Sequence, residues 1–335
     1  MAQQNIMPLT AHYHTITQLR DHLNQRILGQ KALIDRLLLA LLCDGHLLVE
    51  GAPGLAKTKA IKELAACISG SFHRIQFTPD LLPGDLTGTD IYRPEQGIFT
   101  FQPGPLFHNL LLADEINRAP AKVQSALLEA MAERQITIGQ NSYQLPPLFM
   151  VMATQNPIEQ EGTYPLPEAQ LDRFLMYVRI GYPAPQTEHQ ILQLAHAEAR
   201  QQINPKLNQS LHPPISVNEQ SILKMREEVL NTHLSPALQD YIVQLVMGTR
   251  TPERYDEKLA SWIRYGASPR ATIALDRTAR AHAWLAQRDF VTPEDIHSVA
   301  HDVLRHRLIL TFTAEADGIT SDRFIDHLLQ YVSIP

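Results

Sequence analysis

The residues best suited to chemistry lie between positions 51 and 58, where small residues lead into Lys57 and Thr58. The stretch reads Gly51-Ala52-Pro53-Gly54-Leu55-Ala56-Lys57-Thr58, close to the phosphate-loop pattern G-x-x-x-x-G-K-[ST]. In such a loop, backbone N–H groups surround the phosphates, the lysine reaches the outer phosphates, and the hydroxyl ligates Mg²⁺. The alternative is a glycine-containing turn with a chance Lys-Thr, which the position between an apolar run and a helical pattern disfavours. Ala56 stands where the pattern has glycine, and its methyl group is tolerable if the residue keeps ordinary helical torsions.

Two carboxylates follow an apolar run further along the chain. Residues 110–113 are Leu-Leu-Leu-Ala, and Asp114 and Glu115 come directly after them. Phosphoryl transfer depends on positioning and charge neutralisation, so we expect Asp114 to hold the Mg²⁺ site and Glu115 to polarise a water. An acidic pair at this place is otherwise a helix cap. Asn156, which ends another apolar run, could hold the attacking water or the outer phosphate, and Asn156-Pro157 is also a common turn.

Two arginines stand in contexts that ordinary surface charge explains poorly. Arg173 is flanked by apolar residues, in Leu171-Asp172-Arg173-Phe174. Arg270 follows Ser268-Pro269 near a predicted helix start, where the helix dipole disfavours a cation. That cost suggests a task such as phosphate binding. A salt bridge between domains is the alternative for Arg270.

The elements that position these residues alternate between short apolar runs and helical patterns. Strands are expected at residues 46–50, 72–77, 110–113, 149–153 and 175–180. Helices are expected at residues 16–27, 33–41, 61–68 and 121–134. This alternation predicts an α/β fold with a mostly parallel sheet covered on both faces. Residues 85–105 and 135–147 do not fit it and are expected to form inserted β-hairpins, ordinary surface loops being the alternative.

The pattern becomes helical after residue 182. Helices are expected at residues 188–200, 217–229, 236–249, 269–287 and 293–310. Thr292-Pro293 and Ser235-Pro236 are typical helix starts. We therefore predict a nucleotide-binding core at residues 1–182 and an all-α lid at residues 183–335. Residues 250–265 are expected to form an exposed connection, and Arg305-His306-Arg307 a solvated helix face.

Composition excludes several classes. The 335 residues carry a formal charge of −6, which gives no general attraction to nucleic acid or anionic membrane. Cys43 and Cys67 lie in apolar helical patterns and are expected in the core rather than in a disulfide or metal site. No signal peptide is expected, and the longest apolar run, residues 37–43, is too short for a membrane span, so we expect a cytoplasmic protein. The histidines at 12, 14, 297, 301 and 306 lack partners at metal-site spacing.

Taken together, the motifs resemble those of the AAA+ ATPases, and within them the MoxR family. The most specific stretch is residues 162–174, Gly-Thr-Tyr-Pro-Leu-Pro-Glu-Ala-Gln-Leu-Asp-Arg-Phe. Residues 51–58, 113–120 and 266–271 are also similar to that family, and Ala56 is not a departure from it. The resemblance extends from residue 28 to about residue 310.

The resemblance implies a P-loop NTPase fold that binds ATP and Mg²⁺, and it suggests a role for each motif residue. Lys57 and Thr58 look like the phosphate-loop pair, Asp114 and Glu115 like the Mg²⁺ and water-activating acids, and Asn156 like the first sensor. Arg173 resembles the arginine finger that reaches a neighbouring subunit, and Arg270 the second sensor that reports nucleotide state to the lid. Gly29 and Gln30 would lie near the adenine, and Arg118 could be an intersubunit contact. The two hairpins resemble the helix-2 and pre-sensor insertions of the branch that includes magnesium-chelatase ATPase subunits.

The expected function is that of an ATP-driven ring, a hexamer, that remodels or activates a partner in a chaperone-like way. The family commonly acts with partners carrying a von Willebrand A-like domain, and none is visible in this chain, so we expect it on a separate protein. One alternative is a nucleotide-dependent binding scaffold with little turnover. Another is a magnesium-chelatase-like metal-insertion motor subunit. A nucleic-acid motor is disfavoured by the acidic charge.

Overall fold

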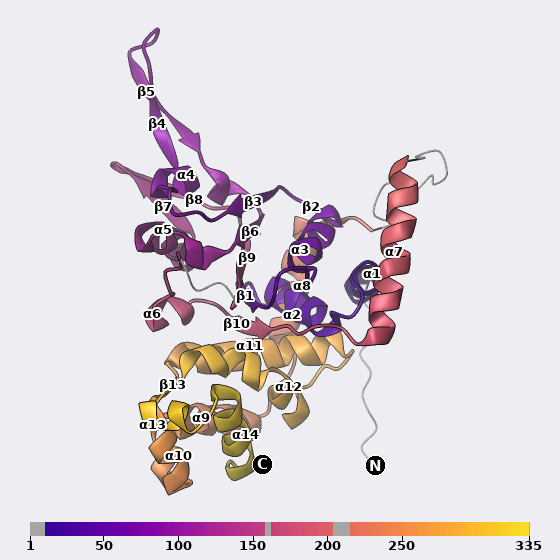
Figure 1. The fold of residues 1–335 in the computed structure, drawn as a ribbon, viewed down its shortest axis with the longest axis vertical. Helices are drawn as coiled ribbons and strands as arrows, with labels where there is room; N and C mark the ends of the chain where they lie inside the picture. The colour runs from indigo at the N-terminus through magenta and orange to yellow at the C-terminus, as the bar shows by residue number, and fades with distance from the viewer. Residues whose placement is uncertain (1–10, 158–161, 204–214, 335) are drawn as a thin grey trace.

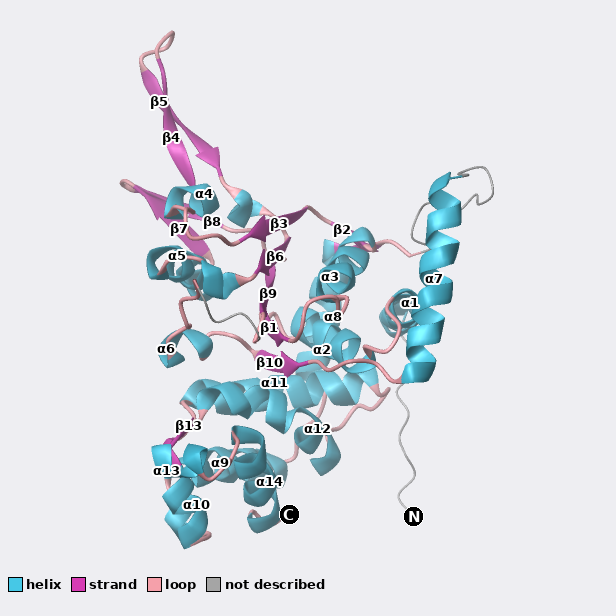
Figure 2. Cartoon of the chain, in the orientation of Figure 1, coloured by secondary structure: helices cyan, strands magenta, loops and turns pink. Residues whose placement is uncertain are grey.

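The central element is a five-stranded parallel sheet. The computed structural model describes residues 11–157, 162–203 and 215–334. The strand order is β10-β1-β9-β6-β3, and every pairing is parallel (Figures 1 and 2). The strands are β1 (Leu47–Glu50), β3 (Phe72–Gln76), β6 (Leu110–Asp114), β9 (Met150–Gln155) and β10 (Met176–Arg179). The five predicted strands are thus confirmed, and their carboxyl ends meet at one edge of the sheet.

Each strand contributes side chains to two apolar layers. Leu111 belongs to one buried cluster and Leu112 to the other, as alternation along a strand requires. The helices α1 (Ala11–Arg26), α2 (Lys31–Leu42) and α3 (Lys57–Ala66) pack on one face, and α5 (Ala121–Glu133) packs on the other. Burial on both faces explains why β1, β6, β9 and most of β10 read as apolar runs, whereas the edge strand β3 is mostly exposed and carries His73, Arg74 and Gln76. Cys43 and Cys67 are buried free thiols, as predicted.

Two hairpins interrupt the α/β alternation, as the sequence predicted. The first pairs β4 (Gly88–Arg93) with β5 (Ile98–Pro103), and it projects away from the rest of the molecule (Figure 1). The second pairs β7 (Gln135–Ile138) with β8 (Asn141–Gln144). The hairpins touch where Phe101 stacks on Tyr143, with ring centroids 4.0 Å apart. A side chain at Gly88 would place its Cβ 2.2 Å from the Gln102 carbonyl, so the base of the first hairpin requires glycine.

Short elements complete this half of the chain. They are β2 (Ile68–Ser69), α4 (Pro83–Thr87), α6 (Glu168–Leu171) and the 3-10 turns Pro105–Phe107 and Ile116–Arg118.

The C-terminal part is built mainly from helices. These are α7 (Pro185–Ile203), α8 (Glu219–Asn231), α9 (Pro236–Arg250), α10 (Glu257–Trp262), α11 (Pro269–Leu285), α12 (Pro293–Leu304), α13 (Phe312–Ala316) and α14 (Ser321–Tyr331). Short strands β11 (Val217–Asn218), β12 (Ile263–Tyr265) and β13 (Ile309–Leu310) lie between them. Helix α8 packs against α1 and α2, and β11 pairs with β2, so this part also covers the N-terminal helices. The domain boundary at residues 182 and 183 stays a prediction.

Helix starts in this part follow the predicted cap chemistry. Ser235 Oγ accepts a hydrogen bond from the Leu238 N–H at 3.3 Å. Thr292 and Asp295 form a capping box at the start of α12.

Three expectations for this part were wrong, and the first two concern its helices. Residues 250–265 are not an exposed connection, because they contain α10, whose Leu259 and Trp262 are buried. The helix expected to run to residue 310 ends at Leu304, where the chain turns into the 3-10 segment Arg305–Arg307. Residues 250–265 are mostly polar, so the sequence did not indicate that Leu259 and Trp262 enter the core.

Arg305, His306 and Arg307 are not a solvated helix face. His306 and Arg307 are buried, and Arg307 Nε donates to Asp172 Oδ1 at 2.8 Å. Arg305 Nη1 donates to the Tyr177 carbonyl of β10 at 2.6 Å. Burial holds the pKa of His306 well below its usual value, so this residue adds no third charge near neutral pH. The segment therefore joins the C-terminal helices to the edge strand of the sheet.

Candidate functional site

Residues 51–58 form the turn between β1 and α3, at the carboxyl edge of the sheet. Gly54 has a φ of +82°, a conformation that glycine adopts freely. Ala56 has a φ of +58° and a ψ of 18°, so the condition of ordinary helical torsions is not met. A left-handed alanine costs about 1–2 kcal/mol, which explains why the general pattern has glycine here. The loop in this chain therefore carries local backbone strain directly before Lys57.

Lys57 lies across the loop. Its Nζ donates to the Gly51 carbonyl at 2.5 Å and to the Gln155 carbonyl of β9 at 3.3 Å. Both acceptors are neutral, and an ammonium forms stronger hydrogen bonds to a phosphate oxygen than to a carbonyl oxygen. The lysine is thus placed to exchange these contacts for a phosphate. Gly51 itself needs glycine, since a Cβ there would lie 2.5 Å from Ile180 Cγ1.

Asp114 ends β6 with a buried carboxylate that is held from two sides. Thr154 Oγ1 donates to Asp114 Oδ1 at 2.7 Å, and Arg74 Nη2 donates to Oδ2 at 2.7 Å. Thr154 Oγ1 also accepts the Glu115 N–H at 2.9 Å, so one hydroxyl fixes both acidic residues. Sequence reasoning missed Thr154, although it lies two positions before Asn156 and its strand is adjacent to β6.

Glu115 follows with a φ of +57°, which turns the chain sharply away from the strand. The Glu115 Oε2 atom accepts a hydrogen bond from Gln76 Nε2 at 2.8 Å. It also forms an ion pair with Arg118, whose Nε lies 3.1 Å away. Arg74 and Gln76 share one face of β3 and bond to each other at 2.9 Å, so β3 contacts both acids. The sequence offered one signal for the contact between β3 and the two acids: Arg74 and Gln76 are two positions apart, so their side chains lie on the same face of a strand. Arg118, predicted as a possible intersubunit contact, lies against Glu115 of its own chain.

The donor set at this edge fits Mg²⁺, which prefers oxygen ligands such as carboxylates and hydroxyls. Asp114 supplies a carboxylate, and Thr58 supplies a hydroxyl from the first turn of α3. The Arg74 guanidinium lies 2.7 Å from Asp114 Oδ2, so a bound Mg²⁺ would share this carboxylate with the arginine. Asn156, also buried, follows β9 between the strands that carry the loop and the acids.

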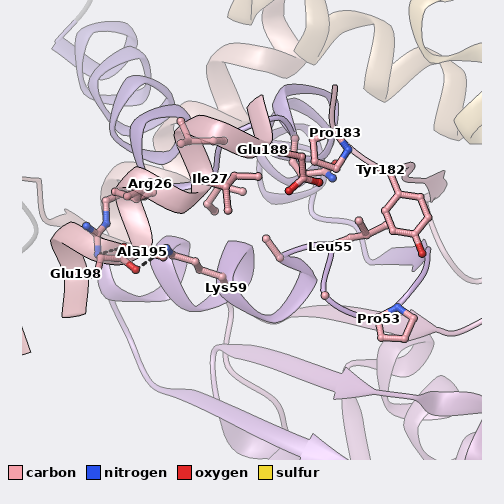
Figure 3. A pocket seen from close by; sticks show the side chains of 16 residues that line it. Arg26, Ile27, Pro53, Leu55, Lys59, Tyr182, Pro183, Glu188, Ala195 and Glu198 are labelled. Atoms are coloured by element: carbon pink, nitrogen blue, oxygen red, sulfur yellow. Dashed lines mark hydrogen bonds and ion pairs between the residues drawn. The ribbon is translucent and has the colours of Figure 1, made fainter. Parts of the chain in front are cut away.

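A pocket lies beside the loop, between the N-terminal helices and α7 (Figure 3). Its loop side is formed by Pro53, Gly54, Leu55 and Ala56, and its other walls include Ile27, Leu28, Gln30, Tyr182, Pro183, Glu188, Ile191 and Leu194. Gln30 Nε2 donates to the Gly181 carbonyl at 3.2 Å. Mostly apolar walls with a few polar groups are typical of a small-molecule site, and the predicted adenine site fits this description. Gly29 is not among the residues that line this pocket, and a Cβ at Gly29 would approach Thr187 Cγ2 to 2.8 Å. A contact between Gly29 and adenine therefore stays a prediction.

Ion pairs close the far end of this pocket. Glu198 of α7 bonds to Lys59 of α3 at 2.8 Å and pairs with Arg26 of α1 at 3.3 Å (Figure 3). These pairs attach α7 to the two helices that it covers. Sequence reasoning did not single out any of the three residues.

Arg173 and Arg270 lie together in a second pocket, away from the loop. Arg173 Nη1 donates to the Leu128 carbonyl at 2.6 Å, and Arg270 Nε is 4.0 Å from Asp172 Oδ2. The pocket also contains residues 45–46, which precede β1, and residues 174–175, which precede β10. It therefore lies at the amino ends of the strands, whereas the phosphate loop lies at their carboxyl ends. A strand of four residues is about 13 Å long, so these arginines are remote from the loop of their own chain.

His46, in this second pocket, gives the chain a predicted pH dependence. Its Nδ1 accepts the Val151 N–H at 3.1 Å, and its Nε2 lies 3.3 Å from the Met131 carbonyl. Burial, with help from Arg134, lowers the pKa of His46 to about 3. The unfolded chain binds a proton near pH 6.5 and the folded chain does not, so stability falls as pH drops from about 6.5 towards 3.

The measurement is the thermal midpoint at pH 7.5 and pH 5. We expect a lower midpoint at pH 5, and a smaller difference for His46→Gln, which keeps one donor and one acceptor without titrating. His189→Gln, at an exposed position of α7, is the control. An unchanged difference for His46→Gln contradicts the assignment.

Comparison with known proteins agrees with this geometry. Residues 46–176 match the family described as "ATPase family associated with various cellular activities (AAA)", and residues 259–328 match the AAA lid domain. The crystal structure of a protein from Cytophaga hutchinsonii superposes with a TM-score of 0.87 at 47% identity, covering 97% of this chain and 96% of that one. The parallel sheet, the phosphate loop and these matches define an AAA ATPase with a lid.

Curated relatives narrow the class to one family. Chaperone MoxR1 of Mycobacterium tuberculosis is 45% identical over 328 residues, covering 98% of this chain and 84% of the relative. Protein MoxR of Paracoccus denitrificans is 35% identical over 308 residues, covering 86% of this chain and 87% of the relative. The chain therefore belongs to the MoxR family. The chloroplastic magnesium-chelatase subunit ChlI of Nicotiana tabacum is more distant, at 28% identity over 64% of this chain and 46% of its own length.

Within residues 11–157, 162–203 and 215–334, no group of three or more His, Cys, Asp or Glu side chains could hold a metal ion. In the same ranges, no helix is long and apolar enough to cross a membrane.

Proposed function

We propose that this protein hydrolyses ATP at the interface between neighbouring copies of the chain. The proposal rests on the distance between two groups of residues in one chain, the nucleotide-binding groups and the two arginines. The phosphate loop, Asp114 and Glu115 gather at the carboxyl edge of the sheet, while Arg173 and Arg270 lie in a pocket at the amino edge. An arginine that stabilises transferring phosphate must touch the nucleotide, so these two serve a second subunit. Repetition of such a head-to-tail contact closes a ring, and we propose a hexamer.

Each group in the site has a separable task. The backbone N–H groups of residues 51–58 and the N-terminus of α3 bind the phosphates, and Lys57 neutralises the outer ones. Asp114 and Thr58 would hold Mg²⁺, which supplies charge neutralisation at the phosphate oxygens. Glu115 takes the proton of the attacking water, and Asn156 orients that water. Arg173 and Arg270 stabilise the negative charge on the neighbour's transferring phosphate.

The work done with this energy is proposed from the relatives. Two similar proteins are named Chaperone MoxR1 and Protein MoxR, which supports remodelling or activation of a separate partner protein. We propose that the partner carries a von Willebrand A-like domain. We also propose that this protein acts in the cytoplasm. The relation to ChlI supports a second candidate, a motor subunit for metal insertion.

The nucleotide site is tested by Lys57→Ala. Loss of the ammonium removes the main positive charge that faces the outer phosphates. We expect ATP affinity to fall at least about a hundredfold, which is the upper end of the loss when a hydrogen bond to a charged group is removed. The measurement is equilibrium binding of a fluorescent ATP analogue. Lys62→Ala, at an exposed position of the same helix, is the matched control and should bind as the parent protein does. Equal affinity of the two variants would remove Lys57 from the site.

A further inference from the structure

The pocket that holds Arg173 and Arg270 contains more positive charge than its own carboxylates balance. Five arginines and two aspartates line it. They are Arg134, Arg173, Arg270, Arg277, Arg307, Asp44 and Asp172. His46 adds no charge near neutral pH, because burial lowers its pKa to about 3. An excess of three positive charges in a concave site attracts a polyanion.

Both aspartates are already paired within the fold. Asp44 Oδ1 accepts from Arg134 Nη2 at 2.6 Å and pairs with Arg226 Nη1 at 2.7 Å. Asp172 Oδ1 accepts from Arg307 Nε at 2.8 Å. Arg134 and Arg307 are held by these contacts at 2.6–2.8 Å, whereas Arg270 reaches Asp172 only at 4.0 Å, so Arg173, Arg270 and Arg277 carry most of the excess charge.

Arg277 is the one of these three to which the sequence and the family gave no role. It lies on α11 seven residues after Arg270, and both line the pocket together with Ile273 and Ala274, so one face of the helix is presented to it. Within the described chain no carboxylate lies within ion-pair distance of Arg277. Arg280, on another face of α11, instead pairs with Asp276 at 2.9 Å.

We propose that Arg277 is a third phosphate-binding arginine for the nucleotide held by the neighbouring subunit. This inference rests on the proposed function. Arg270 and Arg277 are about 10 Å apart along the helix axis, so they contact different parts of the phosphate chain. Arg173 and Arg270 meet the transferring phosphate, and Arg277 binds the phosphates that stay with the nucleoside. Binding them equally in the ground state and the transition state changes KM rather than kcat.

The first test is the kinetics of Arg277→Gln. We expect the KM for ATP of the assembled protein to rise about tenfold, the lower end for a hydrogen bond to a charged group, with kcat changed less than about threefold. The dilute, unassembled protein should bind a fluorescent ATP analogue as before, because its own loop and base pocket are intact. Arg254→Gln, an exposed arginine outside the pocket, should change none of these values.

The second test mixes Arg277→Gln with Lys57→Ala. The Lys57→Ala subunit lacks its own nucleotide but supplies an intact Arg277 to its neighbour, so a fraction of the mixed sites should recover the parent KM. Recovery supports action on the neighbour. A KM equal to that of Arg254→Gln, weaker binding by the unassembled variant, or no recovery on mixing overturns the inference.

The two proposals fail separately. If Arg173→Ala loses turnover while Arg277→Gln behaves like its control, the subunit-interface site stands and the role of Arg277 does not. If Arg173→Ala keeps full turnover, the interface site itself is wrong.

Discussion

Arg173→Ala is expected to lower kcat by about 10³-fold or more while leaving ATP binding within about threefold of the parent. An arginine that stabilises the transferring phosphate from a second subunit contributes about 10³–10⁵ to turnover. Arg173 lies at the amino edge of the sheet, remote from its own loop, so its removal leaves the base pocket and Lys57 untouched. The measurements are steady-state phosphate release and equilibrium nucleotide binding on the same preparation.

Concentration dependence gives a second reading of the same prediction. Turnover per subunit should rise with protein concentration as subunits assemble, and Arg173→Ala should abolish that rise. Arg173→Lys keeps the charge but not the planar fork, and we expect it to recover only part of the rate. Because Arg173 also donates to the Leu128 carbonyl, the thermal midpoints of both variants must be compared with the parent. A dilute monomer as active as the assembled form would falsify the assignment.

The parts of the fold that follow from periodic burial could be predicted from the sequence. The inner strands β1, β9 and β6 are buried on both faces, so they read as apolar runs, as in Leu110-Leu111-Leu112-Ala113. The caps at Ser235 and Thr292 follow from local hydrogen-bond chemistry and form as expected. The phosphate loop was recognisable because its chemistry is contained in eight consecutive residues.

Contacts between distant segments could not be predicted in the same way. Arg307 reads as one of a cluster of surface charges, but its partner Asp172 is 135 positions away. Arg74 and Gln76 contact the acidic pair only because β3 lies beside β6 in the sheet. A single sequence indicates which segments form strands more readily than which strands pair with each other. The side chains next to Asp114 and Glu115 depend on the pairing of β3 with β6.

Ala56 shows a different limit. The letters did not reveal that its φ is +58°, since helix α3 begins only one residue later. Helix α3 holds the residue on its C-terminal side, and alanine has the smallest side chain that carries the Cβ penalty.

Glu115→Gln is expected to lower kcat by about 10²–10⁴ while keeping ATP bound, because the amide cannot take the proton of the attacking water. Gln76 and Arg118, which contact Glu115 Oε2, have an oxygen partner in either form, since the amide keeps one carbonyl oxygen. The substitution thus keeps the shape of the site and removes the base. Glu133→Gln, at an exposed position at the end of α5, is the matched control and should turn over normally. The measurements are single-turnover hydrolysis and retention of labelled ATP.

The same variant addresses the partner. A ring held in its ATP state should retain a client that the hydrolysing protein releases, so affinity capture with Glu115→Gln and ATP is expected to enrich proteins that Glu133→Gln does not. Omission of ATP, or the additional change Lys57→Ala, should remove the enrichment, because both leave the loop without nucleotide. Enrichment of a von Willebrand A-like protein supports the remodelling proposal. Fast hydrolysis by Glu115→Gln removes Glu115 as the base, and capture that is independent of ATP favours a scaffold, since binding would then not depend on the nucleotide cycle.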